Sequence, residues 1–325
     1  MFNLATSADQ KFLPFTYVMV FSLLEQHPQE QVRVFLLHGG LTEEDLTPLH
    51  ELCASRKGAF VPLLVDHSEF ANLGTTPEAK SWPPSAYYRL RLLDLLPEDV
   101  DRLLYLDGDI IVNKNLTDLY HTGLGENLIA ACTDMVSFEE KRKSGRVKAW
   151  PRMLGKLLEE DRYFNSGMIL MDVERLRKKY SFETYRELME ANDKEIRYPD
   201  QDLLNLVHQD ETLILDAWKY NCMPYNVFRI ADKSCEELKE SAYILHFAGP
   251  KPWDDGDHIH YETEQLWWDA ALKTPYKQEF LIRFLQGSLR CRSLEEEIRR
   301  LYDENARLKE GLESIKHSLT GLVKL

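Results

Sequence analysis

The feature that most constrains this chain is the stretch from Arg102 to Val112, RLLYLDGDIIV, where an Asp-Gly-Asp step separates two apolar runs. Such runs, with β-branched residues after the break, predict buried strands of a sheet core. Asp107 and Asp109 are costly to bury there unless a cation or a ligand pairs with them. Both carboxylates can reach one hard divalent ion, and the intervening glycine lets the backbone approach a ligand. The stretch predicts either a metal site that can neutralise a diphosphate or a turn that ends a strand.

The Asp-x-Asp pattern alone is a weak signal, because it occurs four times in this chain. Only the copy at 107 and 109 lies between apolar runs, and the other copies are expected to be surface or capping residues. Those copies are Asp99/Asp101, Asp200/Asp202 and Asp255/Asp257.

The length, composition and net charge indicate a globular protein of one or two domains. The 325 residues suffice for one large α/β domain with an appendage, or for two domains. A hydrophobic content of 44% indicates a globular protein, and a net charge of -14 argues against binding nucleic acid or anionic lipid through bulk electrostatics. The five cysteines form no Cys-x-x-Cys pair, which suggests reduced thiols in a cytoplasmic protein. A peripheral position at the inner face of a membrane is compatible with this expectation.

The start of the chain lacks the basic segment, apolar core and cleavage site of a secretory signal. Phe15–Leu24 is apolar, but it is shorter than the about 20 residues that span a bilayer. We interpret it as a buried helix and expect no integral membrane segment.

Strand-like runs alternate with helical segments, which predicts an α/β fold with a mostly parallel sheet and right-handed crossovers. Pro62 places its strand near an edge of this sheet. Besides the two runs around Asp107, strands are expected at 1–6, 31–37, 59–65, 128–132, 213–215 and 243–247, and 163–171 is expected to be a polar turn running into a strand. Helices are expected at about 14–26, after the cap Thr42, at 86–93 with Ser85 as cap, after Asp172, at 180–190, and at 203–207 with Asp200 as N-cap.

Several polar segments follow the expected strands, where ligands of open α/β sheets bind. The first, Ser7-Ala8-Asp9, is a candidate nucleotide loop or a plain N-cap at Asp9. Arg89 and Arg91 fall on different faces of their helix, so that one can face a phosphate while the other is solvated. The polar stretch 137–156 is either a loop over a site or a surface excursion.

The last of these segments contains His246, which is either a satisfied core histidine or a ligand. It precedes a Gly-Pro turn that carries Lys251, and this combination is a plausible anion cradle.

Together these segments resemble glycosyltransferase family 8, the retaining nucleotide-sugar transferases, over roughly residues 1–270. The resemblance rests on five motifs in the order of the family, each of them weak alone. They are Ser7-Ala8-Asp9, Ala86-Tyr87-Tyr88-Arg89, Leu104-Tyr105-Leu106-Asp107-Gly108-Asp109, Phe164-Asn165-Ser166-Gly167, and Asp200-Gln201-Asp202 followed by His246-Phe247-Ala248-Gly249 and Lys251-Pro252-Trp253.

The resemblance implies a GT-A type nucleotide-binding fold that binds a UDP-sugar and Mn²⁺ or another divalent cation. Asp107, Asp109 and His246 look like the metal ligands, and two oxygens with one imidazole suit Mn²⁺. Gln201 and Asp200 look like the catalytic residues near the anomeric carbon. The residues that look like donor contacts are Ser7, Ala8, Asp9, Arg89, Asp107, Gly108, Asp134, Asn165, Asp200, Gln201, Gly249 and Lys251.

The implied activity is transfer of a hexose, glucose or galactose, from a UDP-sugar to an acceptor hydroxyl of a glycan or glycolipid, with retention at the anomeric carbon. The metal implied by the resemblance would stabilise UDP as it leaves. The neutral amide of Gln201 is a poor nucleophile, which favours same-face attack over a covalent intermediate. The alternative function is a non-catalytic protein that keeps the fold and senses a nucleotide-sugar.

The resemblance does not explain the C-terminus, and we divide the chain into a catalytic domain at 1–275 and a helical region at 276–325. From Leu294 onward the apolar residues follow a heptad register over about 291–322, which predicts a coiled coil and a parallel homodimer. The alternative is one amphipathic helix docked on its own domain. The a positions are Ile298, Asn305, Leu312 and Leu319, and the d positions are Leu294, Leu301, Leu308, Ile315 and Leu322.

Overall fold

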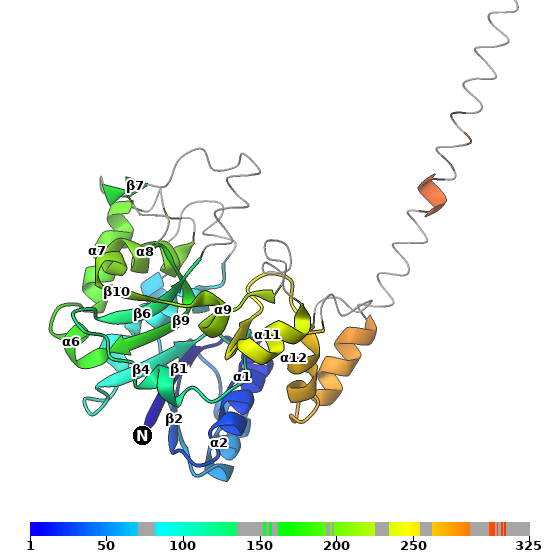
Figure 1. Cartoon of the computed structure of the whole chain (residues 1–325), viewed down its shortest axis with the longest axis horizontal. Helices are drawn as coiled ribbons and strands as arrows, with labels where there is room; N and C mark the ends of the chain where they lie inside the picture. Colours follow the sequence, from blue (N-terminus) through cyan, green and yellow to red (C-terminus); the bar gives the residue numbers. More distant parts are fainter. Residues whose placement is uncertain are drawn as a thin grey trace, which may run out of the picture.

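A seven-stranded sheet with the order β10-β6-β9-β4-β1-β2-β3 forms the centre of the protein (Figure 1). The computed structural model describes residues 1–70, 82–134, 152–153, 156–157, 162–192, 196, 198–224, 234–253, 262–286, 299–302, 304, 307 and 309. The strands of this sheet are β1 (Phe2–Ser7), β2 (Val32–His38), β3 (Ala59–Leu64), β4 (Arg102–Leu106), β6 (Ile129–Thr133), β9 (Phe164–Asp172) and β10 (Thr212–Leu215).

The sheet is mostly parallel, as the alternation of strands and helices predicts. Only β9 runs antiparallel to its neighbours, β4 and β6, and the other pairs within this sheet are parallel. β3 pairs with β2 alone and is an edge strand, which confirms the prediction from Pro62, a residue without an N–H to donate.

Helices cover both faces of the sheet. On one face α1 (Leu13–Gln26) and α2 (Glu43–Ser55) pack into a core with residues of β1, β2 and β4. On the other face η3 (Pro84–Arg91), α7 (Phe182–Asn192) and α8 (Pro199–His208) form a second core. The apolar segment 15–24 is therefore buried within α1, as predicted. The shorter helices are η1 (His67–Phe70), α3 (Leu92–Leu95), α4 (Thr117–Tyr120), α6 (Val173–Arg177), η4 (Gln209–Glu211), α9 (Ala217–Tyr220) and α11 (Cys235–Ser241).

A second sheet, of two strands, fixes the position of the residues that follow β4. β5 (Ile110–Val112) pairs antiparallel with β11 (Ile244–His246), and Ile110 lies opposite His246. The N–H of Phe247 donates to the carbonyl oxygen of Asp109 at 3.0 Å. The Asp-Gly-Asp step thus connects two strands, as predicted, and the register of β5 with β11 brings His246 beside Asp109.

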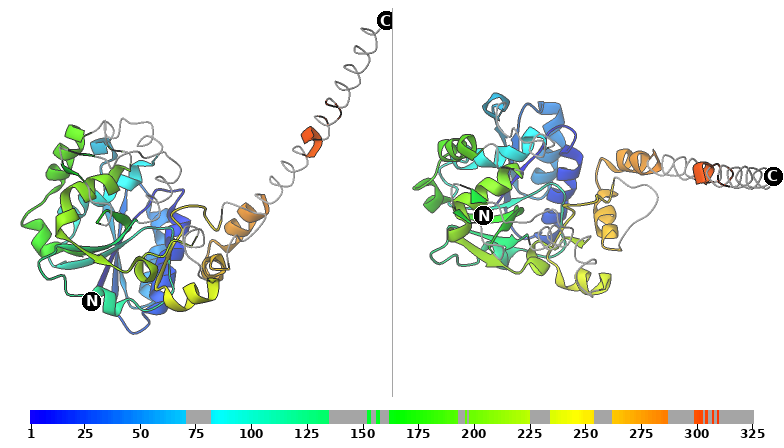
Figure 2. Two further views of the ribbon diagram at one scale, coloured as in Figure 1. Left: turned by 45° about the horizontal axis from the view of Figure 1, so that its top comes forward. Right: turned by 90° about the horizontal axis from the view of Figure 1, so that it is seen from above.

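Two C-terminal helices, α12 (Glu264–Ala271) and a helix at 277–286, complete a third core of aromatic residues. Phe280 lies 5.1 Å from Trp267 and 5.5 Å from Phe15, measured between ring centroids. Figure 2 shows both helices on the side of the molecule that carries α1. Among the described helices, none combines the length and apolar character that crossing a bilayer requires.

Two local predictions on segments that carry the family motifs were wrong. The segment after Pro83 is the 3-10 helix η3, and Pro83 is its N-cap. Ser85 lies within η3 and does not cap an α-helix; its hydroxyl donates to Asp9 at 3.4 Å. Asn165 to Gly167 do not form a turn before a strand, since they lie within β9. The polar groups of this motif therefore have the fixed geometry of a sheet.

The N-cap predicted at Asp200 was also wrong. α8 begins at Pro199 with Tyr198 as its N-cap, and the Tyr198 side chain makes no capping hydrogen bond. Asp200 lies in the first turn, and its carboxylate forms an ion pair with Arg89 at 3.0 Å. A capping residue and a residue paired across the fold look alike in a sequence.

Some predicted segments lie outside the described residues. Of the polar stretch 137–156, the structure describes parts of the two short strands β7 (Arg152–Met153) and β8 (Lys156–Leu157). Asp255 and Asp257 lie outside, as does most of the heptad region at 291–322.

We expect Thr42→Ala to lower the free energy of unfolding by about 1 kcal/mol, because it removes the capping box of α2. Oγ1 of Thr42 accepts from the N–H of Asp45 at 3.2 Å, and the Asp45 carboxylate accepts from the N–H of Thr42 at 2.8 Å. Urea unfolding measures the change. Thr47→Ala on the same helix is the control and should not destabilise, since alanine is the better helix former. Equal losses in both variants would contradict the capping role.

Candidate active site

A cavity of about 270 Å³ lies where β4 ends and β9 begins. Because β9 runs antiparallel to β4, the first residues of β9 share an edge with the residues that follow β4. The end of β11 and the first turn of α8 complete the wall. The cavity is lined by Trp82, Ala86, Arg89, Asp107, Asp109, Asn165, Ser166, Tyr198, Asp200, Gln201, His246, Ala248 and Lys251.

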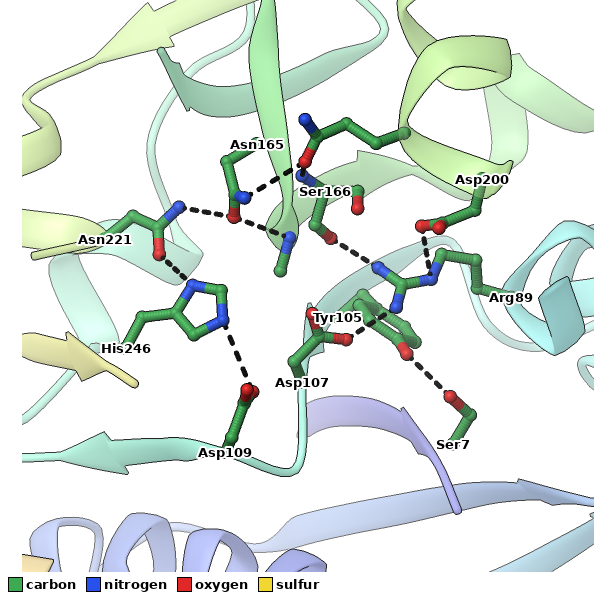
Figure 3. Close-up of polar contacts among 12 residues, drawn as sticks. Ser7, Arg89, Tyr105, Asp107, Asp109, Asn165, Ser166, Asp200, Asn221 and His246 are labelled. Atoms are coloured by element: carbon green, nitrogen blue, oxygen red, sulfur yellow. Dashed lines mark hydrogen bonds and ion pairs between the residues drawn. The ribbon is translucent and has the colours of Figure 1, made fainter. Parts of the chain in front are cut away.

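Asp107, Asp109 and His246 form a cluster in which one ligand atom from each residue lies within 4.8 Å of the others. Nε2 of His246 is 3.3 Å from Oδ1 of Asp109 (Figure 3). Two carboxylate oxygens and one imidazole nitrogen can hold a divalent cation, and the set suits Mn²⁺. The structure therefore brings together the three residues expected to be metal ligands.

Two glycines leave the space that this cluster needs. A Cβ atom on Gly167 would lie 2.3 Å from Cε1 of His246 and 2.9 Å from Oδ2 of Asp107. A Cβ atom on Gly108 would lie 2.3 Å from Oγ1 of Thr16 in α1. All three distances are far below a normal carbon contact. A larger residue at position 167 would therefore displace the cluster, and one at position 108 would collide with α1.

Arg89 is the arginine that faces the site. Its guanidinium forms ion pairs with Asp107 at 2.6 Å and with Asp200 at 3.0 Å. It also donates a hydrogen bond to the carbonyl oxygen of Ser166 at 2.6 Å and lies 4.3 Å from the centroid of the Tyr105 ring. Burial lowers the pKa of Arg89, but the two carboxylates outweigh it and raise that pKa above its ordinary value. Arg89 is therefore a fixed positive charge between two acids.

Arg91, on the other face of η3, forms ion pairs with Glu69 and Asp94 at 3.0 Å each. The two arginines thus separate as their positions on different faces predict.

The two acids of the cluster differ in their electrostatic balance. Burial raises the pKa of Asp107 above its ordinary value despite Arg89, and the charge of Asp109 adds to the rise. Burial acts in the same direction on Asp109, but Lys251 and His246 outweigh it and lower the pKa of Asp109 below its ordinary value. Nζ of Lys251 lies 2.5 Å from Oδ2 of Asp109. The pKa values of the two acids therefore shift in opposite directions, and burial is the largest cause of the rise at Asp107.

The side-chain amide of Gln201 is fixed by four hydrogen bonds. Its Oε1 accepts from Nδ2 of Asn165 at 3.0 Å and from the N–H of Ser166 at 3.2 Å. Its Nε2 donates to Asp134 at 2.9 Å and to the hydroxyl of Tyr163 at 3.2 Å. Both lone pairs and both hydrogens of the amide are thus used within the protein. The structure gives this side chain one orientation.

The expected nucleotide loop follows β1 but does not line this cavity. The hydroxyl of Ser7 lies 2.9 Å from that of Tyr105, and the N–H of Ala8 donates to Leu37 in β2 at 3.1 Å. Oδ1 of Asp9 accepts from the N–H of Phe12 at 2.9 Å, so Asp9 does cap the turn before α1, while its other oxygen lies near Ser85.

Three further expected donor contacts, Gly108, Gly249 and Asp134, are likewise not among the residues that line the cavity. Gly108 packs against Thr16, and Gly249 is exposed between the lining residues Ala248 and Lys251. Asp134 follows β6 and reaches the site through its hydrogen bond from Gln201.

Sequence reasoning missed several residues of the site. In the sequence, Gly167 appeared only as part of the Asn-Ser-Gly motif. The structure shows that its lack of a side chain leaves room for His246 and Asp107. Asn221 had no signal, although its Oδ1 lies 2.8 Å from Nδ1 of His246 (Figure 3). Trp82 and Tyr198, whose ring centroids are 6.4 Å apart, also line the cavity and were read only as loop residues.

Comparison with known proteins identifies the family. A family model described as Glycosyl transferase family 8 matches residues 3–257, and the chain belongs to this family. A lipopolysaccharide 1,2-glucosyltransferase of Escherichia coli is 27% identical over 264 residues, which cover 78% of this chain and 74% of that protein. A lipopolysaccharide 1,3-galactosyltransferase of Salmonella typhimurium is 24% identical over 278 residues, 85% of this chain and 79% of that protein.

Solved structures show the same fold. The galactosyltransferase LgtC, in a complex with donor and acceptor sugar analogs, matches with a TM-score of 0.67 at 23% identity over 84% of this chain and 96% of that chain. The predicted membership of family 8 and the α/β architecture with a mostly parallel sheet are therefore confirmed.

We expect Gly167→Ala to weaken binding of Mn²⁺ by about 10- to 100-fold, the range typical of changes that disturb metal ligands from outside. The new methyl group would collide with His246 and Asp107. Calorimetric titration of Mn²⁺ in the presence of UDP measures the affinity. Gly123→Ala is the matched control, because a Cβ atom there meets nothing within 4 Å. Unchanged affinity in the Gly167 variant would contradict the expectation that Asp107 and His246 are ligands of one cation.

Proposed function

We propose that this family 8 glycosyltransferase is a metal-dependent, retaining hexosyltransferase. It would move glucose or galactose from a UDP-sugar to a hydroxyl group of a glycan or glycolipid. The observation that carries the proposal is the convergence of Asp107, Asp109 and His246 in a cavity that also holds Asp200 and Gln201. The names of the relatives, which are lipopolysaccharide glucosyl- and galactosyltransferases, favour an acceptor of the lipopolysaccharide type.

Asp107, Asp109 and His246 would hold Mn²⁺, which supplies a Lewis acid for the leaving diphosphate. Lys251 would add positive charge beside the same group, since its ammonium already lies at the cluster. Ser7, Ala8, Asp9, Gly108 and Gly249 are proposed to contact the nucleotide from the margin of the cavity.

The donor hexose would lie against Asp200 and Gln201. Because the Gln201 amide uses all of its hydrogen-bonding groups within the protein, it is a poor candidate for a nucleophile. This observation supports same-face attack, with the acceptor hydroxyl entering on the side from which UDP leaves. Asp200, held by Arg89, would accept a hydrogen bond from a sugar hydroxyl and stabilise positive charge at the anomeric carbon. Asn165 and Asp134 would hold Gln201 in place beneath the sugar.

A panel of UDP-sugars tests this function through Mn²⁺-dependent release of UDP. We expect turnover with UDP-glucose or UDP-galactose, and Asp107→Asn or Asp109→Asn should lower it by about 100-fold or more, because each removes a charge that holds the cation. Circular dichroism verifies that each variant is folded. NMR of the product should show the anomeric configuration of the donor.

The control for this experiment is Asp99→Asn, which changes another Asp-x-Asp copy that forms a surface ion pair with Arg33 at 2.8 Å. Its UDP release should equal that of the natural sequence. Near-normal activity in either cluster variant would refute the metal assignment. Binding of UDP without any turnover would favour the nucleotide-sugar sensor instead.

We further propose that the C-terminal heptads join two chains in a parallel coiled coil. The support is the sequence register, in which Asn305 occupies an a position; a buried asparagine pair there fixes register and favours two strands. Glu304 and Lys309 stand at g and e positions, where they can pair between chains. The proposal places two catalytic domains side by side.

Light scattering on the full chain and on a chain that ends near Ser288 tests the dimer. The full chain is expected to be a dimer at micromolar concentration, and the shortened chain a monomer. The shortened chain lacks the heptad region, whereas it keeps the described helix 277–286, which packs Phe280 into the domain. A monomeric full chain, or a shortened chain that is still dimeric, would exclude this role.

A further inference from the structure

The orientation of the His246 ring decides which of its nitrogen atoms can bind a cation. Nδ1 lies 2.8 Å from Oδ1 of Asn221, whereas Nε2 faces Oδ1 of Asp109 at 3.3 Å. His246 and Asn221 are each 3% exposed, so water does not compete for these contacts. Only a proton on Nδ1 leaves the lone pair of Nε2 to the acidic cluster.

Backbone donors fix the direction of the hydrogen bonds that lead to this ring. The N–H of Gly167 can only donate, and it reaches Oδ1 of Asn165 at 3.0 Å. The N–H of Ser166 likewise donates to Oε1 of Gln201, which accepts from Nδ2 of Asn165 at 3.0 Å. The two backbone groups thus set the amide of Asn165 with its oxygen toward Gly167 and its nitrogen toward Gln201.

The orientation of Asn165 determines that of Asn221. Oδ1 of Asn165 accepts a second hydrogen bond from Nδ2 of Asn221 at 2.9 Å (Figure 3). The other end of the Asn221 amide, its oxygen, must then face His246. An oxygen can only accept from Nδ1, so that nitrogen carries the proton.

We propose that Asn221 is a positioning residue for the metal site, which holds His246 with Nδ1 protonated and Nε2 turned to Asp107 and Asp109. Metal-binding histidines generally donate their other N–H to an oxygen that sets their orientation and basicity. Asn221 provides that oxygen from the end of α9, a segment that carries none of the other cluster residues. The inference rests on the proposed metal-dependent function and assigns a residue that supports it.

The experiment compares four full-length proteins: the natural sequence, Asn221→Leu, His246→Ala and the double variant. Mn²⁺ affinity in the presence of UDP is measured by EPR of the free ion. Leucine keeps the size of asparagine and removes its oxygen, so Asn221→Leu should weaken Mn²⁺ binding by about 10- to 100-fold. In the His246→Ala background the same change should have less than about a twofold effect, because its target is gone.

Comparing the affinities for two cations distinguishes loss of His246 positioning from a general loosening of the fold. Ni²⁺ prefers imidazole ligands and Mg²⁺ prefers oxygen ligands, so Asn221→Leu should weaken Ni²⁺ binding more than Mg²⁺ binding. Asn192→Leu is the matched control. Asn192 is also buried, and its Nδ2 donates to Leu188 within α7, so neither cation should be affected.

The outcomes distinguish this inference from the proposed function. If the natural protein does not bind Mn²⁺, the metal-dependent function itself is wrong. If it binds, but Asn221→Leu binds equally well, or lowers affinity equally with and without His246, the positioning role is wrong. An equal loss of Ni²⁺ and Mg²⁺ affinity would also overturn it.

A measurement on the natural sequence covers the case in which Asn221→Leu fails to fold. Long-range proton–nitrogen NMR of the protein labelled with ¹⁵N-histidine locates the ring proton at a pH at which the His246 ring is neutral; comparison with His246→Ala assigns the signal. A proton on Nδ1 supports the inference. A proton on Nε2 with a bare Nδ1 overturns it.

Discussion

The site depends on balancing the negative charge of Asp109, which is buried, and of Asp107, which is half-buried. Buried carboxylates need partners, and distant segments supply them: Arg89 from η3, His246 from β11 and Lys251 from the turn after it. Because Arg89 is shared with Asp200, this balance extends from the cluster to the first turn of α8. The charged residues that line the cavity therefore form one connected set. A divalent cation at the cluster would add positive charge beside both Asp107 and Asp109.

Close packing imposes a second constraint on the same residues. Gly108 lets the Asp-Gly-Asp step lie against α1, and Gly167 lets β9 pass beside the cluster. Hydrogen bonds from the backbone of β9 to Asn165 and Gln201 then fix the polar groups around it. A sheet strand is rigid compared with a loop, so these donors give the side chains defined directions. Ion pairs connect the charged side chains of the site, and hydrogen bonds from the β9 backbone set the orientation of the amide side chains of Asn165 and Gln201.

Much of the fold could be predicted from sequence, because strands with continuous apolar runs and helices with clear caps leave local signals. The Asp107–Asp109 step stood out because it interrupts such a run, and Pro62 marked an edge strand because proline cannot donate. The local pattern predicted a metal site at Asp107 and Asp109 as one of two alternatives, and the family resemblance supplied the fuller set of expected site residues. Asp200 was misread because a first-turn acid matches the N-cap pattern, while its partner Arg89 lies 111 positions away. Asn221 could not be found, since its role depends on contacts with Asn165 and His246 that no spacing in the sequence encodes.

Pulsed EPR of Mn²⁺ bound to the full-length protein with UDP tests the central claim most directly, because it detects nitrogen atoms bound to the ion. The account predicts one directly coordinated histidine nitrogen, which is lost in His246→Ala and retained in a variant of an unrelated buried histidine, His208→Gln. His208 contacts Tyr185 at 2.8 Å, from α8 to α7, and lies outside the metal cluster. A spectrum with oxygen ligands only, or a nitrogen signal that survives in His246→Ala, would contradict the account.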